Sequence, residues 1–376
     1  MFLAWHEMRR SKLRFGLLTG AVGLLVFLIL FQQALLGGLI TQFIGAVRNQ
    51  SADVLVFNDQ ARKNIEGSII LPEQAAAVAA VEGVAVASPL GESTFTVQAD
   101  GSETDAVVFG YVLGGPGAPT TLSAGRLPTA DGEAVASEKD EADGFGIGDT
   151  VTVLGPGGTL DLTVVGVARD LNYSVSPTMF TSFDTFAAAK RVRNGLAEGT
   201  AVLPSVLAVQ VADGADAEAV VERIAAAVGG VEPLTRQQAV DGSPGVSSVR
   251  TSFGVILGLF YLVVPLVTGL FFLIVTFQKA SALTLLRAIG ARARTLVVAL
   301  LVQVVLVMAL GSLVAFGLYA GALQGVKNLG VRVEVMPVVV TSLVVLALAL
   351  VTSLVAVRRV LRIDPLDATT GAGVHL

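Results

Sequence analysis

Four stretches without a charged side chain constrain this chain more than any other feature of its sequence. Residues 15–47, 251–278, 295–326 and 335–357 contain no Asp, Glu, Lys or Arg. Each is longer than the roughly 20 apolar residues that an α-helix needs to cross a bilayer core about 30 Å thick. We therefore predict a membrane protein with four transmembrane α-helices, in which a large domain, residues 49–248, separates the first helix from the other three.

The segment 49–248 is an acidic, water-soluble block. It holds 26 of the 30 acidic residues but only 10 of the 25 basic residues, in a chain of net charge −5 and mean hydropathy +0.74. A block dominated by one sign of charge is typical of a solvated domain and argues against binding to nucleic acid. The chain has no cysteine, which excludes disulfides and sites built on thiolates. We expect this domain to be held together by its own core, for which it is large enough.

Basic residues beside the four spans predict their orientation. Eleven Lys and Arg residues flank the N-terminus, the 278–295 loop and the C-terminus, whereas four flank the opposite side. Because such residues concentrate on the cytoplasmic side, we expect both termini inside the cell, the acidic block outside and the protein in the plasma membrane. The first apolar run is too long for a signal peptide, so we predict an uncleaved anchor.

Sequence patterns in the outside block predict an α+β domain of two lobes. Helices are expected at 72–81 and 215–228, each between two strands, in units that span 53–88 and 205–234. These two units are expected to pair into one lobe, and the segment 104–185, rich in Gly, Pro and Thr, into the other. The strands expected are 53–57, 84–88, 93–97, 106–111, 150–154, 160–167 and 205–211.

Three features refine the predicted helices. At about 1.5 Å per residue, the first uncharged run is longer than the membrane is thick, so its helix is expected to continue outside as a stalk through Gln42 and Arg48. Pro265 predicts a kink or hinge in the second span. Glycines four residues apart predict faces on which helices approach closely, namely Gly16 and Gly20, and Gly317, Gly321 and Gly325.

Several kinds of chemistry are missing from the sequence. It contains no glycine-rich phosphate loop, and its two histidines, His6 and His375, lie at the termini that we expect inside the cell. The four spans carry no Asp, Glu, Lys or Arg that would indicate a proton relay. We therefore predict that the chain is not an enzyme and has no catalytic residue, no metal site and no resident cofactor.

The loop between the second and third spans points to a partner. Its recurring Leu283, Leu286 and Ile289 predict a short amphipathic helix, although a turn with basic flanks fits as well. The run LLRAIGA at 285–291 resembles the signature of FtsX-like, macrolide-exporter-like (type VII) ABC transporter permeases, which share the arrangement of one helix, an outside domain and three helices. The C-terminal run 358–368 and parts of the outside block resemble the same family.

That resemblance implies a homodimer of permeases served by a separate ATPase subunit, with the loop as coupling helix. The coupling residues would be Leu283, Leu286, Arg287, Ile289 and Gly290. The family often has an acidic residue five positions before the arginine, and Ala282 stands there in this sequence, which puts an ion pair with the ATPase at that position in doubt.

Within the family, the chain is most similar to heme-exporting members, which implies efflux of a hydrophobic substrate, heme. Without cysteine or an outside histidine, an iron ligand would be Tyr, Met or a carboxylate. We expect tyrosine at the iron, phenylalanine on the porphyrin faces and arginine at the propionates, although ordinary packing explains the aromatic residues equally well. The residues are Tyr173, Tyr261, Phe43, Phe253, Phe260, Arg48 and Arg250. Alternative functions are an FtsX-like signal relay to a cell-wall enzyme and a permease that handles lipoproteins or peptides.

The predicted division of the chain follows from these points. Phe2, Trp5 and Met8 recur three apart, which predicts an amphipathic helix on the inner membrane surface, or alternatively a plain basic flank. The segments expected are the inner-surface helix 1–14, span and stalk 15–48, outside domain 49–248, span 249–278, coupling helix 279–294, span 295–326, span 335–357 and cytoplasmic tail 358–376.

Overall fold

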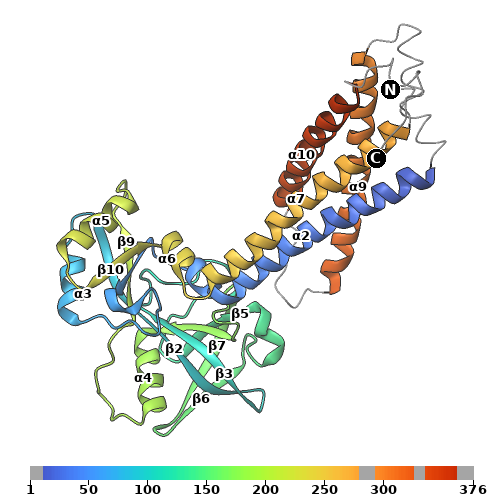
Figure 1. Ribbon diagram of the computed structural model, residues 1–376. Helices are drawn as coiled ribbons and strands as arrows, with labels where there is room; N and C mark the ends of the chain where they lie inside the picture. The colour runs from blue at the N-terminus through green and yellow to red at the C-terminus, as the bar shows by residue number, and fades with distance from the viewer. Residues whose placement is uncertain (1–11, 279–292, 326–334, 362–376) are drawn as a thin grey trace, which may run out of the picture. The chain divides into compact units, whose positions relative to one another are not determined.

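A computed structural model describes residues 12–278, 293–325 and 335–361 (Figure 1). The chain divides into two compact units. The helical unit contains Thr251–Lys327 together with Met1–Leu36 and Val331–Leu376, and the sheet unit contains Gly37–Arg250. The predicted inner-surface helix with Phe2, Trp5 and Met8, most of the predicted coupling helix and most of the predicted cytoplasmic tail lie outside the described residues.

The helical unit is built from four long helices. They are α2 (Lys12–Arg48), α7 (Val246–Gln278), α9 (Ala293–Gly325) and α10 (Val335–Leu361). Three of them contain segments long and apolar enough to cross a membrane, namely Phe15–Arg48, Val246–Phe271 and Leu301–Ala322. The fourth contains a shorter apolar segment, Val339–Leu354. Three of the four predicted spans thus meet this criterion, and the fourth stays a prediction.

The helices pack through aliphatic side chains and one pair of glycines. α2, α7, α9 and α10 all contribute to a common core, with Val22, Val264 and Val345 fully buried in it. α2 and α9 are in close contact at Gly23 and Gly311, where a Cβ on Gly23 would lie 3.0 Å from the Gly311 carbonyl oxygen. A side chain at either position would separate the two helices.

The glycines that the sequence singled out are not at this contact. A Cβ on Gly16, Gly20, Gly317 or Gly321 would meet nothing within 4 Å in the described chain. Their predicted packing role therefore finds no partner within the described residues and stays a prediction for contacts with another chain. Pro265 lies inside α7, which continues through it, and α2 runs without interruption to Arg48, as the predicted stalk requires.

Ten strands of the sheet unit form one sheet with the order β10-β1-β9-β2-β3-β8-β5-β7-β4, while β6 pairs with β2 and β7. The strands are β1 (Val54–Asn58), β2 (Val84–Ala99), β3 (Ser102–Tyr111), β4 (Leu122–Gly125), β5 (Glu133–Ser137), β6 (Thr150–Gly155), β7 (Gly158–Ala168), β8 (Thr178–Ser182), β9 (Val206–Val211) and β10 (Val231–Thr235). The short helices η1 (Asp59–Ala61) and η2 (Glu138–Asp143) lie between strands, and α6 (Arg236–Gly242) follows β10 and leads to α7.

The first lobe consists of the two predicted strand–helix–strand units. β1 pairs antiparallel with both β9 and β10, and β9 pairs with the first half of β2. Helices α3 (Pro72–Ala79) and α5 (Ala217–Ala227) close its core through Val78, Val220 and Ile224 (Figure 1). The pairing of the units 53–88 and 205–234 is confirmed, because the antiparallel ladder joins them directly.

The second lobe is a closed ring of six strands. β2 pairs with β3, β3 with β8, β8 with β5, β5 with β7, β7 with β6, and β6 again with β2. The sequence predicted two strands at 84–88 and 93–97, but β2 is a single strand whose first half serves one lobe and whose second half serves the other. The polar residues between those halves pair with β9 and β3, so they do not end the strand.

Helix α4 (Phe183–Asn194), which the sequence analysis did not predict, packs on this ring. Its Phe186 is fully buried over Gly91 and Gly110, which are register partners on β2 and β3. A Cβ on either glycine would lie 2.2 Å from an atom of Phe186. The absence of a side chain at the two glycines therefore lets the phenyl ring of Phe186 approach the backbone of both strands.

Candidate functional site

The loop between β7 and β8 holds the last turns of α2. The backbone N–H groups of Ser174 and Val175 donate to the carbonyl oxygens of Phe43 and Gln42, both at 3.0 Å. Both loop residues adopt positive φ, 51° at Ser174 and 61° at Val175. This conformation is rare for a β-branched residue and costs on the order of 1–3 kcal/mol, which the two hydrogen bonds to the helix help to offset. We call this loop, residues 170–176, the clamp.

The clamp also accepts a hydrogen bond from α2, and its Asn172 side chain bonds to residues of β5 and η2. The Ala46 N–H donates to the Asn172 carbonyl oxygen at 3.2 Å. The Asn172 side chain accepts from Ser137 Oγ at 2.9 Å and donates to Asp140 Oδ2 at 2.8 Å. Burial raises the pKa of Asp140, and the hydrogen bond from Asn172 opposes that rise. Asn172 therefore connects the helix end, which bonds to its backbone carbonyl, with β5 and η2, which bond to its buried side chain.

Close approach of the clamp depends on Gly45. A Cβ at this position would lie 2.4 Å from the Asp170 carbonyl oxygen and 3.0 Å from its carbonyl carbon. Both are backbone atoms, so a rotamer change cannot relieve the overlap. By contrast, a Cβ on Gly37 in the same helix would meet nothing within 4 Å.

A small cavity lies beside the clamp. Its volume is about 170 Å³, and its walls are Phe43, Ile44, Asn64, Glu66, Tyr173, Ser174, Ser243, Pro244 and Val246. The structure thus brings together Phe43 and Tyr173, two of the residues expected at the substrate. The cavity is smaller than the roughly 300–1,000 Å³ typical of pockets for drug-sized ligands, so a porphyrin does not fit in it in this conformation.

Tyr173 is almost enclosed. Its side chain is 9% exposed, and its ring packs edge-on against Phe109 with the centroids 5.3 Å apart. Its hydroxyl has no hydrogen-bond partner among the residues that the structure describes. Burial raises the pKa of Tyr173, and the negative charges of Glu92 and Glu66 raise it further. The phenol therefore remains protonated at physiological pH.

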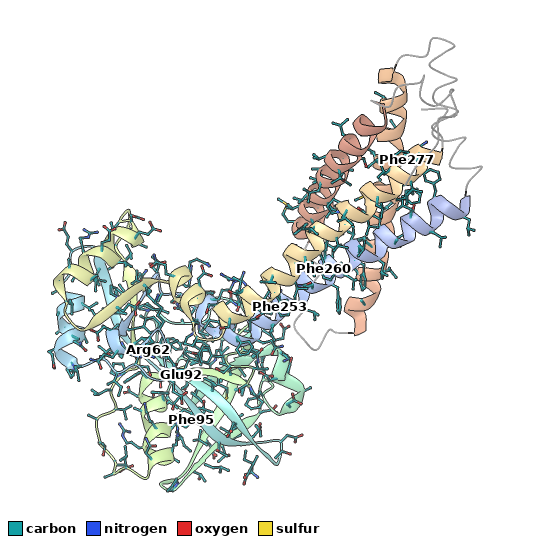
Figure 2. All side chains as sticks on the ribbon, viewed as in Figure 1. Arg62, Glu92, Phe95, Phe253, Phe260 and Phe277 are labelled. Atoms are coloured by element: carbon teal, nitrogen blue, oxygen red, sulfur yellow. The ribbon has the colours of Figure 1, made fainter. Side chains whose placement is uncertain are left out.

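Glu92 is a buried carboxyl group that the sequence analysis passed over (Figure 2). It is 2% exposed, and its Oε2 atom has no hydrogen-bond partner within the described chain. Burial raises its pKa to about 8, with a further contribution from Glu66, while Lys190 and Arg193 act in the opposite direction. On β2 it lies opposite Phe109, the residue against which Tyr173 packs.

The helical unit places Tyr261 in a polar contact among apolar side chains. Gln33 Nε2 on α2 donates to the Tyr261 hydroxyl on α7 at 3.3 Å, and Gln33 Oε1 accepts from Thr341 Oγ1 on α10 at 3.1 Å. Three helices are therefore joined through one glutamine side chain. In an apolar medium such groups need internal partners, which here they supply to one another.

The other predicted aromatic residues of α7 lie along the same helix (Figure 2). Phe260 packs against the helical core, as does Tyr261. Phe253 accepts a hydrogen bond from Gln32 Nε2 at its backbone oxygen, at 2.9 Å. Gln32 and Gln33 thus bond to α7 at successive levels.

The two predicted arginines belong to the sheet unit and differ in their partners. Arg250 Nη1 pairs with Asp241 Oδ1 at 2.6 Å, and both side chains are about half exposed. Arg48, at the end of α2, is exposed. The predicted coupling residues Leu283, Leu286, Arg287, Ile289 and Gly290 lie outside the described residues.

Two family models match the chain. The model of the MacB-like periplasmic core domain matches residues 16–227, and the model of the FtsX-like permease C-terminal region matches residues 254–365. The chain belongs to the MacB-like and FtsX-like ABC transporter permeases. The family predicted from the LLRAIGA run is therefore confirmed, and such a permease works with an ATPase subunit.

Individual relatives match the permease over its whole length at low identity. A Staphylococcus haemolyticus protein whose name assigns it to hemin transport, the permease HrtB, is 22% identical, with 99% of each chain covered. An uncharacterized ABC transporter permease of Mycobacterium tuberculosis is 27% identical with the same coverage. Among solved structures, the periplasmic region of MacB from Actinobacillus actinomycetemcomitans matches at 14% identity and a TM-score of 0.37, covering 53% of this chain and 97% of its own.

The clamp and Glu92 are the parts of this site that sequence reasoning missed. The clamp depends on backbone hydrogen bonds and on positive φ at Ser174 and Val175. Neither residue type predicts a positive φ, so the sequence did not indicate this conformation. Glu92 carried no signal in the sequence, because it lies between the two predicted strands 84–88 and 93–97, which the structure joins into β2. In the permease its burial follows from the strand serving two lobes at once.

Gly45→Ala is expected to destabilise the sheet unit of the permease by about 1–3 kcal/mol, because the new methyl group overlaps the backbone of the clamp. Thermal unfolding of the purified full chain measures the change. Gly37→Ala is the matched control, and it should be neutral or slightly stabilising because alanine favours the helix and meets no neighbour. Equal effects of the two substitutions would contradict the assigned role of Gly45.

Glu92→Gln is expected to remove a pH-dependent loss of stability. Because the folded pKa is raised from 4.5 to about 8, the unfolded carboxyl ionises first as pH rises. The stability contributed by Glu92 is therefore complete below pH about 4.5, falls as pH rises to about 8 and is constant above that. The melting temperature of the variant, relative to that of the wild-type permease, should rise across this window. Parallel pH profiles of the two proteins would show that Glu92 is not held protonated.

Proposed function

We propose that this permease is the transport subunit of an ATP-driven efflux system that exports a hydrophobic substrate, heme. The support is the whole-length similarity to permeases named for hemin transport, together with a tyrosine hydroxyl positioned among apolar helices. ATP is hydrolysed by a separate subunit, and the permease acts as a homodimer. Arg287 and its neighbours in the 279–294 loop form the coupling helix.

The apolar surface of α7 suits a substrate that arrives from the bilayer. Val255, Leu259, Leu262 and Leu266 are 70, 59, 60 and 57% exposed. They recur three or four residues apart and so share one face of the helix. A flat amphiphile dissolved in lipid would reach this face laterally, without a water-filled pore. Phe253 and Phe260 lie on the other side of α7, where Phe260 packs against the helical core, so they would pack on the rings of the substrate after it moves between the helices.

Tyr261 is the better of the two proposed iron ligands. Its hydroxyl already accepts a hydrogen bond from Gln33, and an ionised oxygen could keep the same donor. Ligation by Tyr173 would first require the walls of its cavity to open. Arg48 and Arg250, the arginines expected at the propionates, belong to the sheet unit, where Arg48 is exposed and Arg250 pairs with Asp241.

The proposed orientation in the plasma membrane has both termini inside and the sheet unit outside. The chain has no cysteine, so single cysteines can be introduced cleanly. Ser102→Cys, at an exposed position of the β2–β3 hairpin, should react with an impermeant thiol reagent on intact cells. Thr284→Cys, in the loop that carries Arg287, should react only after permeabilisation. The reverse pattern would overturn both the orientation and the placement of the coupling helix.

Heme binding tests the proposed substrate. Heme added to the purified permease should give a saturable shift of its Soret absorption band. Tyr261→Phe should weaken this binding roughly tenfold or more because the proposed ligand oxygen is lost, whereas Tyr173→Phe should have a smaller effect. Both variants keep the aromatic ring and hence most of the packing.

Deletion of the gene provides the second measurement, and the cells should become more sensitive to heme. An absent Soret shift together with unchanged heme tolerance would exclude heme. The alternatives, a signal relay to a cell-wall enzyme and a permease for lipoproteins or peptides, would then be tested in its place.

A further inference from the structure

We propose that Thr341 on α10 is a positioning residue for the bound substrate. Its hydroxyl holds the side-chain amide of Gln33 on α2 in the orientation that presents an N–H donor to the hydroxyl oxygen of Tyr261 on α7. The inference rests on the proposed contact of Tyr261 with heme iron, and it adds a residue that acts on this contact through Gln33.

The direction of the first hydrogen bond is fixed by its two atoms. Thr341 Oγ1 lies 3.1 Å from Gln33 Oε1. An amide oxygen can only accept, so the threonine hydroxyl is the donor. The Thr341 side chain is 2% exposed, and burial of this kind keeps water from competing for the bond.

The second hydrogen bond follows from the first. A side-chain amide carries its oxygen on one side and its nitrogen on the other. With Oε1 at Thr341, the nitrogen of Gln33 is directed to Tyr261, where Nε2 donates to the hydroxyl oxygen at 3.3 Å. Without the threonine hydroxyl, the amide would form one hydrogen bond to Tyr261 in either orientation, with the phenol as acceptor or as donor. Thr341 therefore decides which of the two orientations the amide adopts.

The orientation of the amide matters for a phenol that binds a metal. A tyrosine oxygen that coordinates Fe(III) carries negative charge, and a charged oxygen is stabilised by an N–H donor. The amide oxygen in the same place would repel it. This difference is large among apolar helices, because charges are screened less there than in water. Thr341 therefore favours coordination of iron by Tyr261 without itself being a ligand.

The bond of Thr341 to another helix differs from those of two other threonines in the helical unit. Thr268 on α7 donates from Oγ1 to a carbonyl oxygen of its own helix at 2.8 Å. Thr352, also on α10, donates to two carbonyl oxygens of its own helix at 3.0 and 3.1 Å. Bonds of this kind are common for threonine in a helix. Thr341 instead bonds to α2, so its hydroxyl acts between helices.

Heme titrations of purified permease variants, followed at the Soret band, test this role. Thr341→Val replaces the hydroxyl with a methyl group of similar size, and it should weaken heme binding about five- to tenfold because the amide is no longer held. Thr341→Ser keeps the hydroxyl, and Thr352→Val removes a hydroxyl that bonds to its own helix. Both should bind heme within about twofold of the wild type. Melting temperatures verify that the variants fold.

Two further measurements separate positioning from a general structural effect. In the Tyr261→Phe background, Thr341→Val should have no further effect on heme affinity, because the oxygen that receives the amide N–H is gone. Resonance Raman spectra of the heme complex should show the vibrations of an iron-bound phenolate in the wild type and in Thr341→Ser, and lose them in Thr341→Val. Unchanged heme affinity in Thr341→Val, failure of Thr341→Ser to preserve binding, or equal effects of Thr341→Val with and without the Tyr261 hydroxyl would overturn the inference.

Fluorine NMR of the permease labelled with 3-fluorotyrosine tests the same hydrogen bonds without heme. The chain has four tyrosines, and the resonance that disappears in Tyr261→Phe belongs to Tyr261. Thr341→Val should move this resonance, whereas Thr341→Ser and Thr352→Val should leave it in place. A wild type that binds no heme but shows the moved resonance refutes heme as substrate and supports the action of Thr341 on Tyr261. A resonance that Thr341→Val leaves unmoved overturns the inference, whether or not heme binds.

Discussion

The backbone hydrogen bonds between the end of α2 and the clamp are the contact on which the sheet unit depends. The membrane-anchored helix offers its carbonyl oxygens at Gln42 and Phe43, and the loop between β7 and β8 supplies the matching N–H groups. This exchange requires a glycine at position 45 and left-handed backbone at Ser174 and Val175. Displacement of the helix end would therefore act directly on backbone atoms of the loop between β7 and β8, with no flexible side chain in between.

A movement of the clamp would affect the other strands of the second lobe, because β7 and β8, which flank the clamp, belong to a closed ring of strands. β7 and β8 both pair with β5, and the ring continues through β3, β2 and β6. A ring without free edges cannot shift one strand without rearranging its neighbours. β2 extends beyond the ring to pair with β9, so both lobes share one continuous strand. Phe186, seated over Gly91 and Gly110, fixes α4 on that strand.

The sequence allowed three membrane-spanning candidates, the α+β class and the pairing of the two strand–helix–strand units to be predicted, because long apolar runs and hydrophobic periodicity are local signals. It did not reveal α4, whose apolar residues are too few to stand out, or the continuity of β2, where local residue types suggested an interruption. Of the candidate site, Phe43 and Tyr173 do share a cavity. The clamp and the contact of Phe186 with Gly91 and Gly110 could not be predicted. Both depend on close approach between backbone segments that are far apart in the sequence.

Glu92 is an ionisable side chain buried inside the sheet unit. Burying a carboxyl group beside another acid is costly, and the raised pKa of Glu92, about 8, is the measure of that cost. Well-packed apolar side chains would fill the same space more stably, so stability alone does not account for these residues. A nearby cation would reduce the cost by favouring the ionised carboxylate. Lys190 and Arg193 on α4 act in this direction on Glu92, but burial outweighs them and keeps the carboxyl group mostly protonated at neutral pH.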